Sequence, residues 1–267
     1  MIRVLELFSG TRSVGKVCDE LGWESVSVDL ISEATHKCDI MDFNYKQYPK
    51  DYFSIVWASP PCTNYSKLQD CFLGRERKGV LYTKEIQEAE MKEDDKLVLR
   101  TLEIIDYFNP EYYFIENPAT SKMKDRDYMK DRPFYIVDYC MYSDWGYRKR
   151  TRIWTNKKGW NAKKCDGSGA CGNMIEIETK GAVRHDTGKP IKSDNRVVHI
   201  SNCGKSETLR AIKKSEKKIH ISNCGNTERL RKARNRLEAQ GRGDNNSTTQ
   251  ADRYRVPADL IFSLFLE

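Results

Sequence analysis

The pattern of apolar and polar positions divides the chain into a first part of alternating strands and helices and a later part that lacks this pattern. Short apolar runs predict strands over residues 2–8, 24–29, 53–58, 112–116, 134–139 and 151–155. Apolar residues at helical spacing predict helices over residues 13–21, 85–108 and 257–266. Strands that alternate with helices and are apolar throughout are typical of a parallel sheet covered on both faces. We therefore expect an α/β fold with a mostly parallel, doubly wound sheet.

A tandem repeat marks the later part of the chain, where glycine, lysine and short polar stretches dominate after about residue 156. Residues 199–212 resemble residues 220–233, and each copy has the pattern of a strand, an Asn-Cys-Gly turn and a basic helix. Two copies are too few for a solenoid, so we interpret them as a duplication within a small lobe. The expected organisation is a first domain over residues 1–156, a small lobe over 157–249 and a C-terminal helix within 250–267 that returns to the first domain.

Composition narrows the class of protein. Of the 267 residues, 39% are hydrophobic and 32% are charged, which is typical of a soluble globular protein. No apolar run approaches the roughly 20 residues that span a membrane. The first residues lack the features of a signal peptide, and the nine cysteines form no regular framework. We therefore expect an intracellular, cytoplasmic protein with reduced thiols and no membrane partner.

The distribution of charge favours a polyanionic partner. The formal net charge is +7, and residues 148–164 and 205–242 are heavily basic, whereas residues 85–95 are acidic. A basic face is more often plain solvated surface. Two basic segments beside candidate site residues nevertheless favour nucleic acid.

The first candidate site is a Phe-Ser-Gly turn at residues 8–10, between the first strand and the first helix. A glycine turn at the carboxyl edge of a parallel sheet lets the backbone approach a ligand. Asp29 ends the second strand, where a carboxylate can accept hydrogen bonds from a ribose diol, and Asp39 with Ile40 is placed to meet an adenine edge. Taken singly, Asp29 and Asp39 are each compatible with an ordinary solvent-exposed loop residue. Their order and spacing after the glycine turn favour a nucleoside cofactor. Because the turn lacks a P-loop lysine, a triphosphate is disfavoured.

Two reactive side chains follow strands at the predicted sheet edge. Cys62 comes after two prolines, a rigid position where cationic groups or backbone N–H donors can stabilise a nucleophilic thiolate. Glu116, followed by Asn117, ends another strand, and a carboxyl group in a dry pocket can act as an acid or hydrogen-bond donor. The alternatives are a buried structural cysteine and a surface acid. The two groups at one sheet edge together predict a catalytic site.

Alternating arginines form the last motif. Arg148, Arg150 and Arg152 are spaced to point to one face of a strand. Such a row of arginines suits contacts to phosphate groups, and an arginine within the row could reach a base. The alternative is a charged edge strand.

In chain order, these motifs resemble those of the DNA cytosine-5 methyltransferase family. The resemblance rests on the Phe-Ser-Gly turn, Asp29, Asp39, the Pro-Cys pair at Cys62, the Glu-Asn pair at Glu116, Arg150-x-Arg152 and a closing segment at residues 253–257. It covers residues 1–156 and 250–267 and is strongest to compact viral and phage members. The first domain is then the catalytic domain, and the small lobe is the target-recognition region.

The resemblance implies S-adenosylmethionine as the cofactor, double-stranded DNA as the partner and a monomer. It further implies that a cytosine is flipped out of the duplex, that Cys62 attacks carbon 6 of its ring and that Glu116 contacts ring nitrogen 3 and the exocyclic amine. The implied catalytic residues are Cys62, Glu116, Asn117, Arg150 and Arg152. We assign Phe8, Ser9, Gly10, Thr11, Asp29, Leu30, Asp39, Ile40 and Pro60 to the cofactor site. Ser66, Arg148, Lys149, Lys205, Arg210 and Arg231 are assigned to nucleic acid.

Three other functions stay open. An amino-group methyltransferase is one, because residues 59–61 partly fit the Ser-Pro-Pro-aromatic motif of those enzymes, although Cys62 stands at the aromatic position. A transfer RNA substrate is another, because one branch of the family methylates that RNA and a basic lobe suits both polymers. The third is a DNA-binding protein that has kept the fold without the activity.

A metal site in the small lobe is a further possibility. Cys165, Cys171, His185, Cys203 and Cys224 include zinc-ligand types, but the gap between Cys165 and Cys171 is wide for a zinc pair. Duplication also explains Cys203 and Cys224. We therefore expect free thiols and assign no metal ligand.

Overall fold

The computed structural model describes residues 1–77, 79–143, 148–168, 170–171 and 255–267, together with the strand backbones of 174–179, 194–199 and 219–220. The chain forms two compact units. The first comprises Met1–Val137, Arg150–Lys163 and Ala251–Glu267, and the second comprises Asp138–Lys149 and Lys164–Gln250. Relative to the expected boundaries, residues 138–149 fall in the second unit and residues 157–163 in the first.

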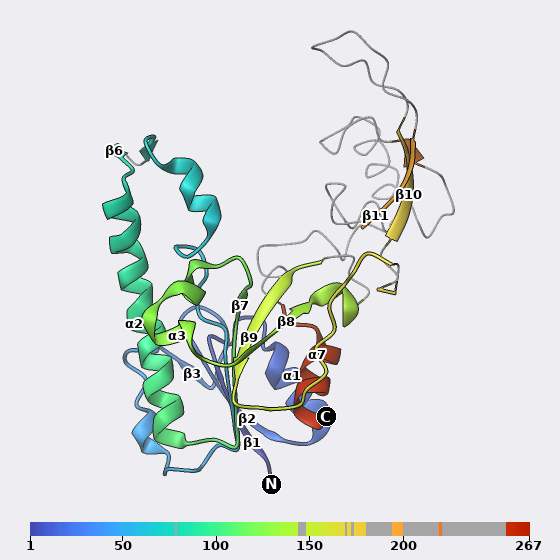
Figure 1. The fold of residues 1–267 in the computed structure, drawn as a ribbon. Coiled ribbons are helices and arrows are strands. Elements are labelled where there is room, and N and C mark those ends of the chain that lie inside the picture. The colour runs from blue at the N-terminus through green and yellow to red at the C-terminus, as the bar shows by residue number, and fades with distance from the viewer. Residues whose placement is uncertain are drawn as a thin grey trace. The chain divides into compact units, whose positions relative to one another are not determined.

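A seven-stranded sheet forms the centre of the first unit (Figure 1). Its strands, in spatial order, are β3 (His36–Lys37), β2 (Glu24–Asp29), β1 (Arg3–Leu7), β4 (Ile55–Ala58), β7 (Tyr112–Pro118), β9 (Arg150–Thr155) and β8 (Phe134–Asp138). From β3 to β7 all neighbours are parallel, and β9 runs antiparallel to β7. The mostly parallel, doubly wound sheet predicted from the sequence is therefore confirmed.

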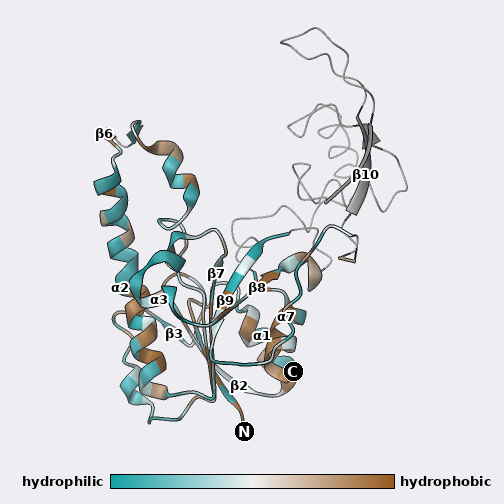
Figure 2. Cartoon of the chain, viewed as in Figure 1, coloured by the Kyte–Doolittle hydropathy of each residue, from teal (hydrophilic) through white to brown (hydrophobic). Residues whose placement is uncertain are grey.

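Helices cover both faces of this sheet because alternate residues of each strand point to opposite sides. The long helix α2 (Lys84–Phe108) packs Val98, Leu102 and Ile105 into the core that also holds Leu5 and Ile115 of the strands. Figure 2 shows that α2 is hydrophilic along its first half and carries hydrophobic patches along its second half. The apolar half is therefore the part that packs on the sheet.

The opposite face of the sheet is covered by α1 (Ser13–Leu21) and the C-terminal helix α7 (Ala258–Leu266). The ring of Phe265 on α7 lies 5.9 Å from that of Phe114 and 6.4 Å from that of Trp57, measured between centroids. The backbone N–H of Val256 donates to Ser13 Oγ at 3.2 Å. These contacts fasten the last residues of the chain beside the turn that follows β1.

The remaining elements are short. In the first unit they are η1 (Tyr45–Gln47), η2 (Lys67–Phe72), β5 (Glu76–Arg77), β6 (Val80–Leu81), η3 (Lys122–Asp125) and α3 (Asp127–Lys130). The second unit contains η4 (Tyr139–Met141) and a sheet of β10 (Met174–Thr179), β11 (Asp194–His199) and β12 (Ile219–His220). Most of the repeat at residues 199–212 and 220–233 lies outside the described residues. No helix within the described ranges is long and apolar enough to cross a membrane.

Candidate active site

Strand register brings three loops to one edge of the sheet. Leu7 at the end of β1 pairs with Ala58 at the end of β4, and Ala58 pairs with Ile115 of β7. The backbone N–H of Ser59 donates to the carbonyl oxygen of Leu7 at 3.2 Å. Because the three strands are parallel, the glycine turn, the Pro-Pro-Cys loop and the Glu-Asn pair all begin at the same carboxyl edge.

The turn after β1 has a backbone that few side chains tolerate. Phe8 has φ 58° and Gly10 has φ 46°, both in the left-handed region. The N–H of Gly10 donates to Asp29 Oδ2 at 2.8 Å, which ties the turn to the end of β2. Ser9 Oγ is buried and has no hydrogen-bond partner among the described residues, and Thr11 Oγ1 lies 3.0 Å from Ser13 Oγ.

Asp29 is held by backbone groups on both sides. Its Oδ1 accepts hydrogen bonds from the N–H groups of Ile31 at 2.9 Å and Ser32 at 2.7 Å. Partial burial raises the pKa of Asp29, but these bonds and the one from Gly10 outweigh it and hold the pKa below its ordinary value. The side chain is therefore a carboxylate with a fixed orientation at the second strand end.

Glu6 was not singled out by its sequence pattern, yet it organises the start of α1. Its two carboxyl oxygens accept hydrogen bonds from the N–H groups of Val14 at 3.1 Å and Gly15 at 2.9 Å. The first N–H groups of a helix have no partner within the helix, so Glu6 supplies their acceptors from the neighbouring strand. Only 3% of Glu6 is exposed, and this burial raises its pKa to about 7.

The other predicted cofactor residues are placed in different surroundings. Asp39 is half-buried, and its Oδ1 accepts a hydrogen bond from the N–H of Met41 at 2.9 Å. Ile40 is buried in the core beneath α2, whereas Leu30 is exposed. Pro60 is buried at the start of the Pro-Pro-Cys loop.

The loop that carries Cys62 is anchored to β7. The side-chain amide of Asn117 donates to the carbonyl oxygen of Pro60 at 3.0 Å. Asn117 is 1% exposed and Glu116 is 5% exposed, whereas Cys62 is half-buried. Cys62 therefore lies two residues along the chain from the buried Asn117–Pro60 hydrogen bond. That bond joins its loop to the end of β7, which carries the buried carboxyl group of Glu116.

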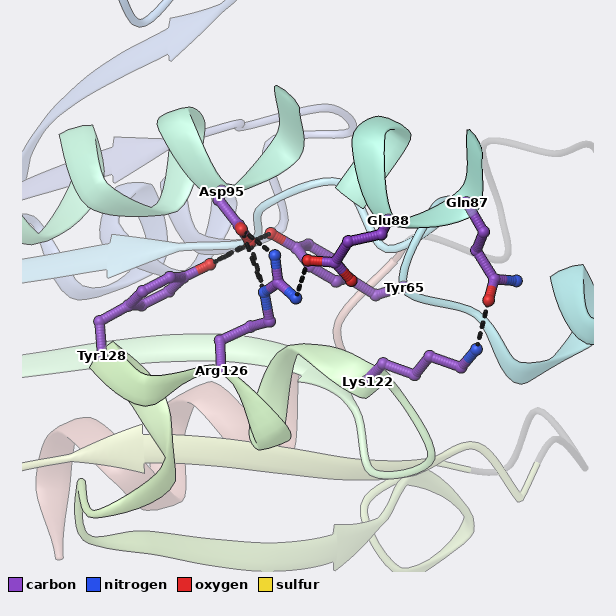
Figure 3. Close-up of polar contacts among 7 residues, drawn as sticks. All are labelled: Tyr65, Gln87, Glu88, Asp95, Lys122, Arg126 and Tyr128. Carbon is purple, nitrogen blue, oxygen red and sulfur yellow. Dashed lines mark hydrogen bonds and ion pairs between the residues drawn. The ribbon is translucent and has the colours of Figure 1, made fainter. Parts of the chain in front are cut away.

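A polar network that the sequence did not predict holds the continuation of this loop. Tyr65, three residues after Cys62, is fully buried and donates to Asp95 Oδ1 of α2 at 2.7 Å. Figure 3 shows that Tyr128 and Arg126 also point at this carboxylate, and both donate to it. Arg126 in addition donates to Glu88 Oε1 at 2.8 Å. One acid on α2 thus joins the Cys62 loop to the segment that follows β7.

Lys122 adds a second link between these segments. Its backbone N–H donates to the carbonyl oxygen of Tyr65 at 2.8 Å, and its Nζ donates to Gln87 Oε1 of α2 at 2.9 Å (Figure 3). Sequence spacing gave no signal for this arrangement, because its members come from three separate segments. The sequence marks residues 85–95 only as an acidic stretch within a predicted helix.

Arg152 lies opposite Asn117 in the β7–β9 register. Its guanidinium carbon is 3.8 Å from the centroid of the Phe134 ring, a cation–π contact. Partial burial lowers the pKa of Arg152, and its Nε is buried without a partner among the described residues. Arg150, two residues earlier on β9, is exposed.

The residues predicted to contact nucleic acid have mixed surroundings. Arg148 Nη2 donates to the carbonyl oxygen of Cys165 at 2.9 Å, and Lys149 Nζ lies 4.9 Å from the centroid of the Tyr139 ring, both within the second unit. Ser66 caps η2, with its Oγ accepting from the N–H of Leu68 at 3.2 Å. Lys205, Arg210 and Arg231 lie outside the described residues.

A doubly wound sheet thus carries a glycine turn, a strand-end acid and a Cys-Glu-Asn group at one carboxyl edge, which is where open α/β sheets bind their ligands. No family model matches the chain. A protein of Frog virus 3 (isolate Goorha) named "Probable DNA (cytosine-5)-methyltransferase" is 42% identical over 186 residues, which cover 69% of this chain and 84% of that protein. The chain belongs to the DNA cytosine-5 methyltransferase family.

Two solved structures to which the chain is similar have low sequence identity to it. The Dnmt2 methyltransferase of S. pombe is 15% identical with a TM-score of 0.34, and a mutant DNMT2 of Spodoptera frugiperda is 17% identical with a TM-score of 0.37. The matches cover 61% and 62% of this chain. The chain spans about half the length of these structures, 51% and 54% respectively.

Proposed function

We propose that the protein transfers a methyl group from S-adenosylmethionine to carbon 5 of cytosine in double-stranded DNA, with Cys62 as the nucleophile. The observation that carries this proposal is the buried hydrogen bond from Asn117 to Pro60, which joins the Cys62 loop to the strand end that carries Glu116. Covalent attack on a pyrimidine needs a thiol and an acid at fixed separation. Transfer to an exocyclic amine needs neither, so this pair disfavours an amino-group methyltransferase.

In the proposed reaction the thiolate of Cys62 adds to carbon 6 of a cytosine that has left the base stack. Glu116, 5% exposed in its dry surroundings, contacts ring nitrogen 3 and the exocyclic amine and stabilises the charge that develops on the ring. Carbon 5 then takes the methyl group, a base removes the proton from carbon 5, and elimination releases Cys62. Asn117 holds the loop and touches no reacting atom.

The turn after β1 fits the cofactor. S-adenosylmethionine, when bound, supplies an electrophilic methyl group on a sulfonium centre. The left-handed backbone at Phe8 and Gly10 leaves room for close approach, and the buried Ser9 Oγ, which has no partner within the described part of the chain, offers a donor and an acceptor. Asp29 has a fixed carboxylate at the position where a ribose diol would be bound.

Arg150 and Arg152 are proposed to bind the displaced nucleotide and its backbone. They alternate along β9 at the carboxyl edge of β7, where Thr151 pairs with Pro118 and Arg152 with Asn117. The Phe134 ring beneath the Arg152 guanidinium holds it flat, which suits a two-point contact with phosphate.

Bisulfite sequencing of plasmid DNA from cells that express the full chain tests the proposed activity. We expect 5-methylcytosine at a defined sequence context with the wild type and with Cys71→Ser, an exposed cysteine outside the site. We expect none with Cys62→Ser. Full conversion of every cytosine with the wild type, or equal protection of cytosine with Cys62→Ser, would contradict the proposal.

An assay with purified protein separates DNA from RNA. Methyl transfer from labelled S-adenosylmethionine is measured with duplex DNA, with transfer RNA and with both together. Preference for duplex DNA supports the proposed substrate. Preference for transfer RNA would be compatible with the proposed Cys62 chemistry but would contradict DNA as the substrate.

A further inference from the structure

Three cysteine side chains of the second unit converge from separate segments. Cys140 lies in η4, directly after β8, and Cys165 and Cys171 flank a glycine-containing loop. Their sulfur atoms all lie within 4.8 Å of one another. Cys140 is 2% exposed and Cys165 is 3% exposed, whereas Cys171 is half-buried, so two of the three thiols are buried. Among the residues with described side chains, this is the one cluster of potential metal ligands.

The sulfur spacing matches a shared metal ion better than a disulfide. Cys165 Sγ and Cys171 Sγ are 3.7 Å apart. Tetrahedral zinc with Zn–S bonds of about 2.3 Å places two thiolate sulfurs about 3.8 Å apart. A disulfide requires about 2.05 Å between its sulfurs. Three cysteines also cannot all be satisfied by one disulfide, whereas three thiolates are a common zinc-binding set.

The surrounding polar groups hold the cluster in place. The N–H of Cys165 donates to Asp138 Oδ2 at 2.9 Å, and its carbonyl oxygen accepts from Arg148 Nη2 at 2.9 Å. Asp138 is fully buried, and its Oδ1 lies 4.0 Å from Arg148 Nε. In metal sites, such outer groups fix the orientation of the ligands. Here they fix the backbone of one ligand on both of its sides.

The loop between Cys165 and Cys171 is shaped to bring its two ends together. Asp166 Oδ1 accepts a hydrogen bond from the N–H of Ser168 at 2.8 Å, which tightens the turn. Gly167 has φ 87°, a conformation that glycine adopts without strain. This turn explains how a spacing wider than that of most zinc pairs still brings both sulfurs to one point.

A divalent ion compensates the charge of three adjoining thiolates, and its binding releases the thiol protons to solvent.

We propose that Cys140, Cys165 and Cys171 bind one zinc ion as three thiolates, with the fourth tetrahedral position taken by a further ligand. The ion has a structural role, because it joins η4 to the 165–171 loop within the second unit. This site is independent of the Cys62 chemistry. It also revises the expectation of free thiols and adds Cys140, which lies too far along the chain for local spacing to associate it with Cys165 and Cys171.

Metal analysis of the full-length protein tests this site. The protein is expressed with added zinc, dialysed against metal-free buffer and measured by inductively coupled plasma mass spectrometry. We expect about one zinc ion per chain in the wild type. Cys140→Ser, Cys165→Ser and Cys171→Ser should each lose it, whereas Cys71→Ser, which removes an exposed cysteine of η2, should keep it.

Cobalt substitution keeps the test decisive if a serine variant fails to fold. Wild-type protein reloaded with Co²⁺ should show thiolate-to-cobalt charge-transfer absorption and the intense visible bands of tetrahedral coordination, and Cys71→Ser should show the same. A wild type without bound zinc would overturn the proposal. So would a Cys165–Cys171 disulfide in a non-reducing peptide map, or a cobalt spectrum without charge transfer.

Discussion

The side-chain amide of Asn117 and the carbonyl oxygen of Pro60 form a 3.0 Å hydrogen bond inside the protein, between the ends of two neighbouring parallel strands. Through this bond the position of the Cys62 loop depends directly on β7, which carries Glu116. The alignment of the two proposed reacting groups is therefore built into the sheet register, and it can be tested by removing the bond.

Asn117→Ala should lower kcat more than it changes KM for DNA. The substitution leaves the Pro60 carbonyl unpaired in a buried place, which costs about 1–3 kcal/mol of stability and loosens the thiol. A loss of about 1.4 kcal/mol in alignment corresponds to a tenfold loss of rate. Steady-state kinetics and urea unfolding measure the two effects.

Asn156→Ala is the matched control for that variant. Asn156 follows β9, and its side chain also bonds backbone groups, accepting from the N–H of Tyr113 at 3.0 Å and donating to the carbonyl oxygen of Glu111 at 2.9 Å. It does so near the amino end of β7, away from Cys62. We expect reduced stability with unchanged kcat. Equal kinetic effects of the two variants would contradict the positioning role of Asn117.

Asp95→Asn should destabilise the protein more than Tyr65→Phe. The asparagine removes the charge that pairs with Arg126, at a cost of about 2–3 kcal/mol, whereas the loss of the Tyr65 hydroxyl removes one of several hydrogen bonds and costs about 1 kcal/mol. Burial opposes ionisation of Asp95, but hydrogen bonds from Arg126, Tyr128 and Tyr65 prevail and lower its pKa.

The lowered pKa of Asp95 determines how the stability loss in Asp95→Asn changes with pH. An acid with a depressed folded-state pKa contributes stability that is present above its unfolded pKa and is lost as the pH falls through the folded value. The difference in unfolding free energy between wild type and Asp95→Asn should therefore be full near neutral pH and shrink below about pH 4. A difference that stays constant down to strong acid would show that the charge of Asp95 does not matter.

Glu6→Gln should show the opposite pH dependence. Burial raises the pKa of Glu6 from 4.5 to about 7, so the folded state retains a proton that the unfolded state has lost between these values. The contribution of Glu6 to wild-type stability is thus full below about pH 4.5 and declines as the pH rises to about 7, by about 3 kcal/mol. The glutamine is neutral throughout and lacks this decline.

Urea unfolding at pH 5 and pH 8 checks the Glu6 prediction. The advantage of wild type over Glu6→Gln should be larger at pH 5 than at pH 8. Glu20→Gln, on the exposed side of the same helix, should follow the wild-type curve. Parallel pH profiles of wild type and Glu6→Gln would contradict the buried, protonated state of Glu6.

Arg152→Lys should weaken DNA binding although it keeps the positive charge. Lysine cannot stack its head group on the Phe134 ring as a flat guanidinium does, and it offers no two-point contact to phosphate. We expect the Kd for DNA to rise about tenfold while affinity for S-adenosylmethionine is unchanged. Fluorescence anisotropy with labelled duplex DNA and calorimetry with the cofactor measure the two affinities.

Arg3→Lys is the control for the Arg152 variant. Arg3 also stacks on an aromatic ring, with its guanidinium carbon 4.5 Å from the centroid of the Tyr52 ring, but it lies at the amino end of β1. Its replacement should leave DNA affinity unchanged. Equal losses of DNA affinity in both variants would mean that Arg152 has no specific place in the nucleotide site.

Local pattern predicted most of the sheet and its main helices. The helix predicted over residues 13–21 is observed as Ser13–Leu21, because a regular apolar face and Gly22 define both of its ends. The Pro-Cys and Glu-Asn motifs are also recognisable from the sequence, because each directly follows an apolar run that predicts a strand. Whether these residues act as proposed stays a prediction.

Contacts between distant segments were not predictable from the sequence. Asp95 looked like one acid among many in a charged helix, and only the fold reveals that Tyr65, Arg126 and Tyr128 converge on it. Cys140 likewise joins Cys165 and Cys171 across more than 20 residues, so no local spacing signals the cluster. Such groups depend on three-dimensional packing, which a periodic pattern does not specify.

The most direct test of Cys62 as the nucleophile is covalent trapping on duplex DNA that contains 5-fluorocytosine at the target site, in the presence of S-adenosylmethionine. Fluorine at carbon 5 blocks the final elimination, so the enzyme stays attached to the base. We predict a stable protein–DNA adduct whose peptide map places the nucleotide on Cys62, with none formed by Cys62→Ser. Methylation of unmodified DNA without any trapped adduct, or an adduct at another residue, would contradict it.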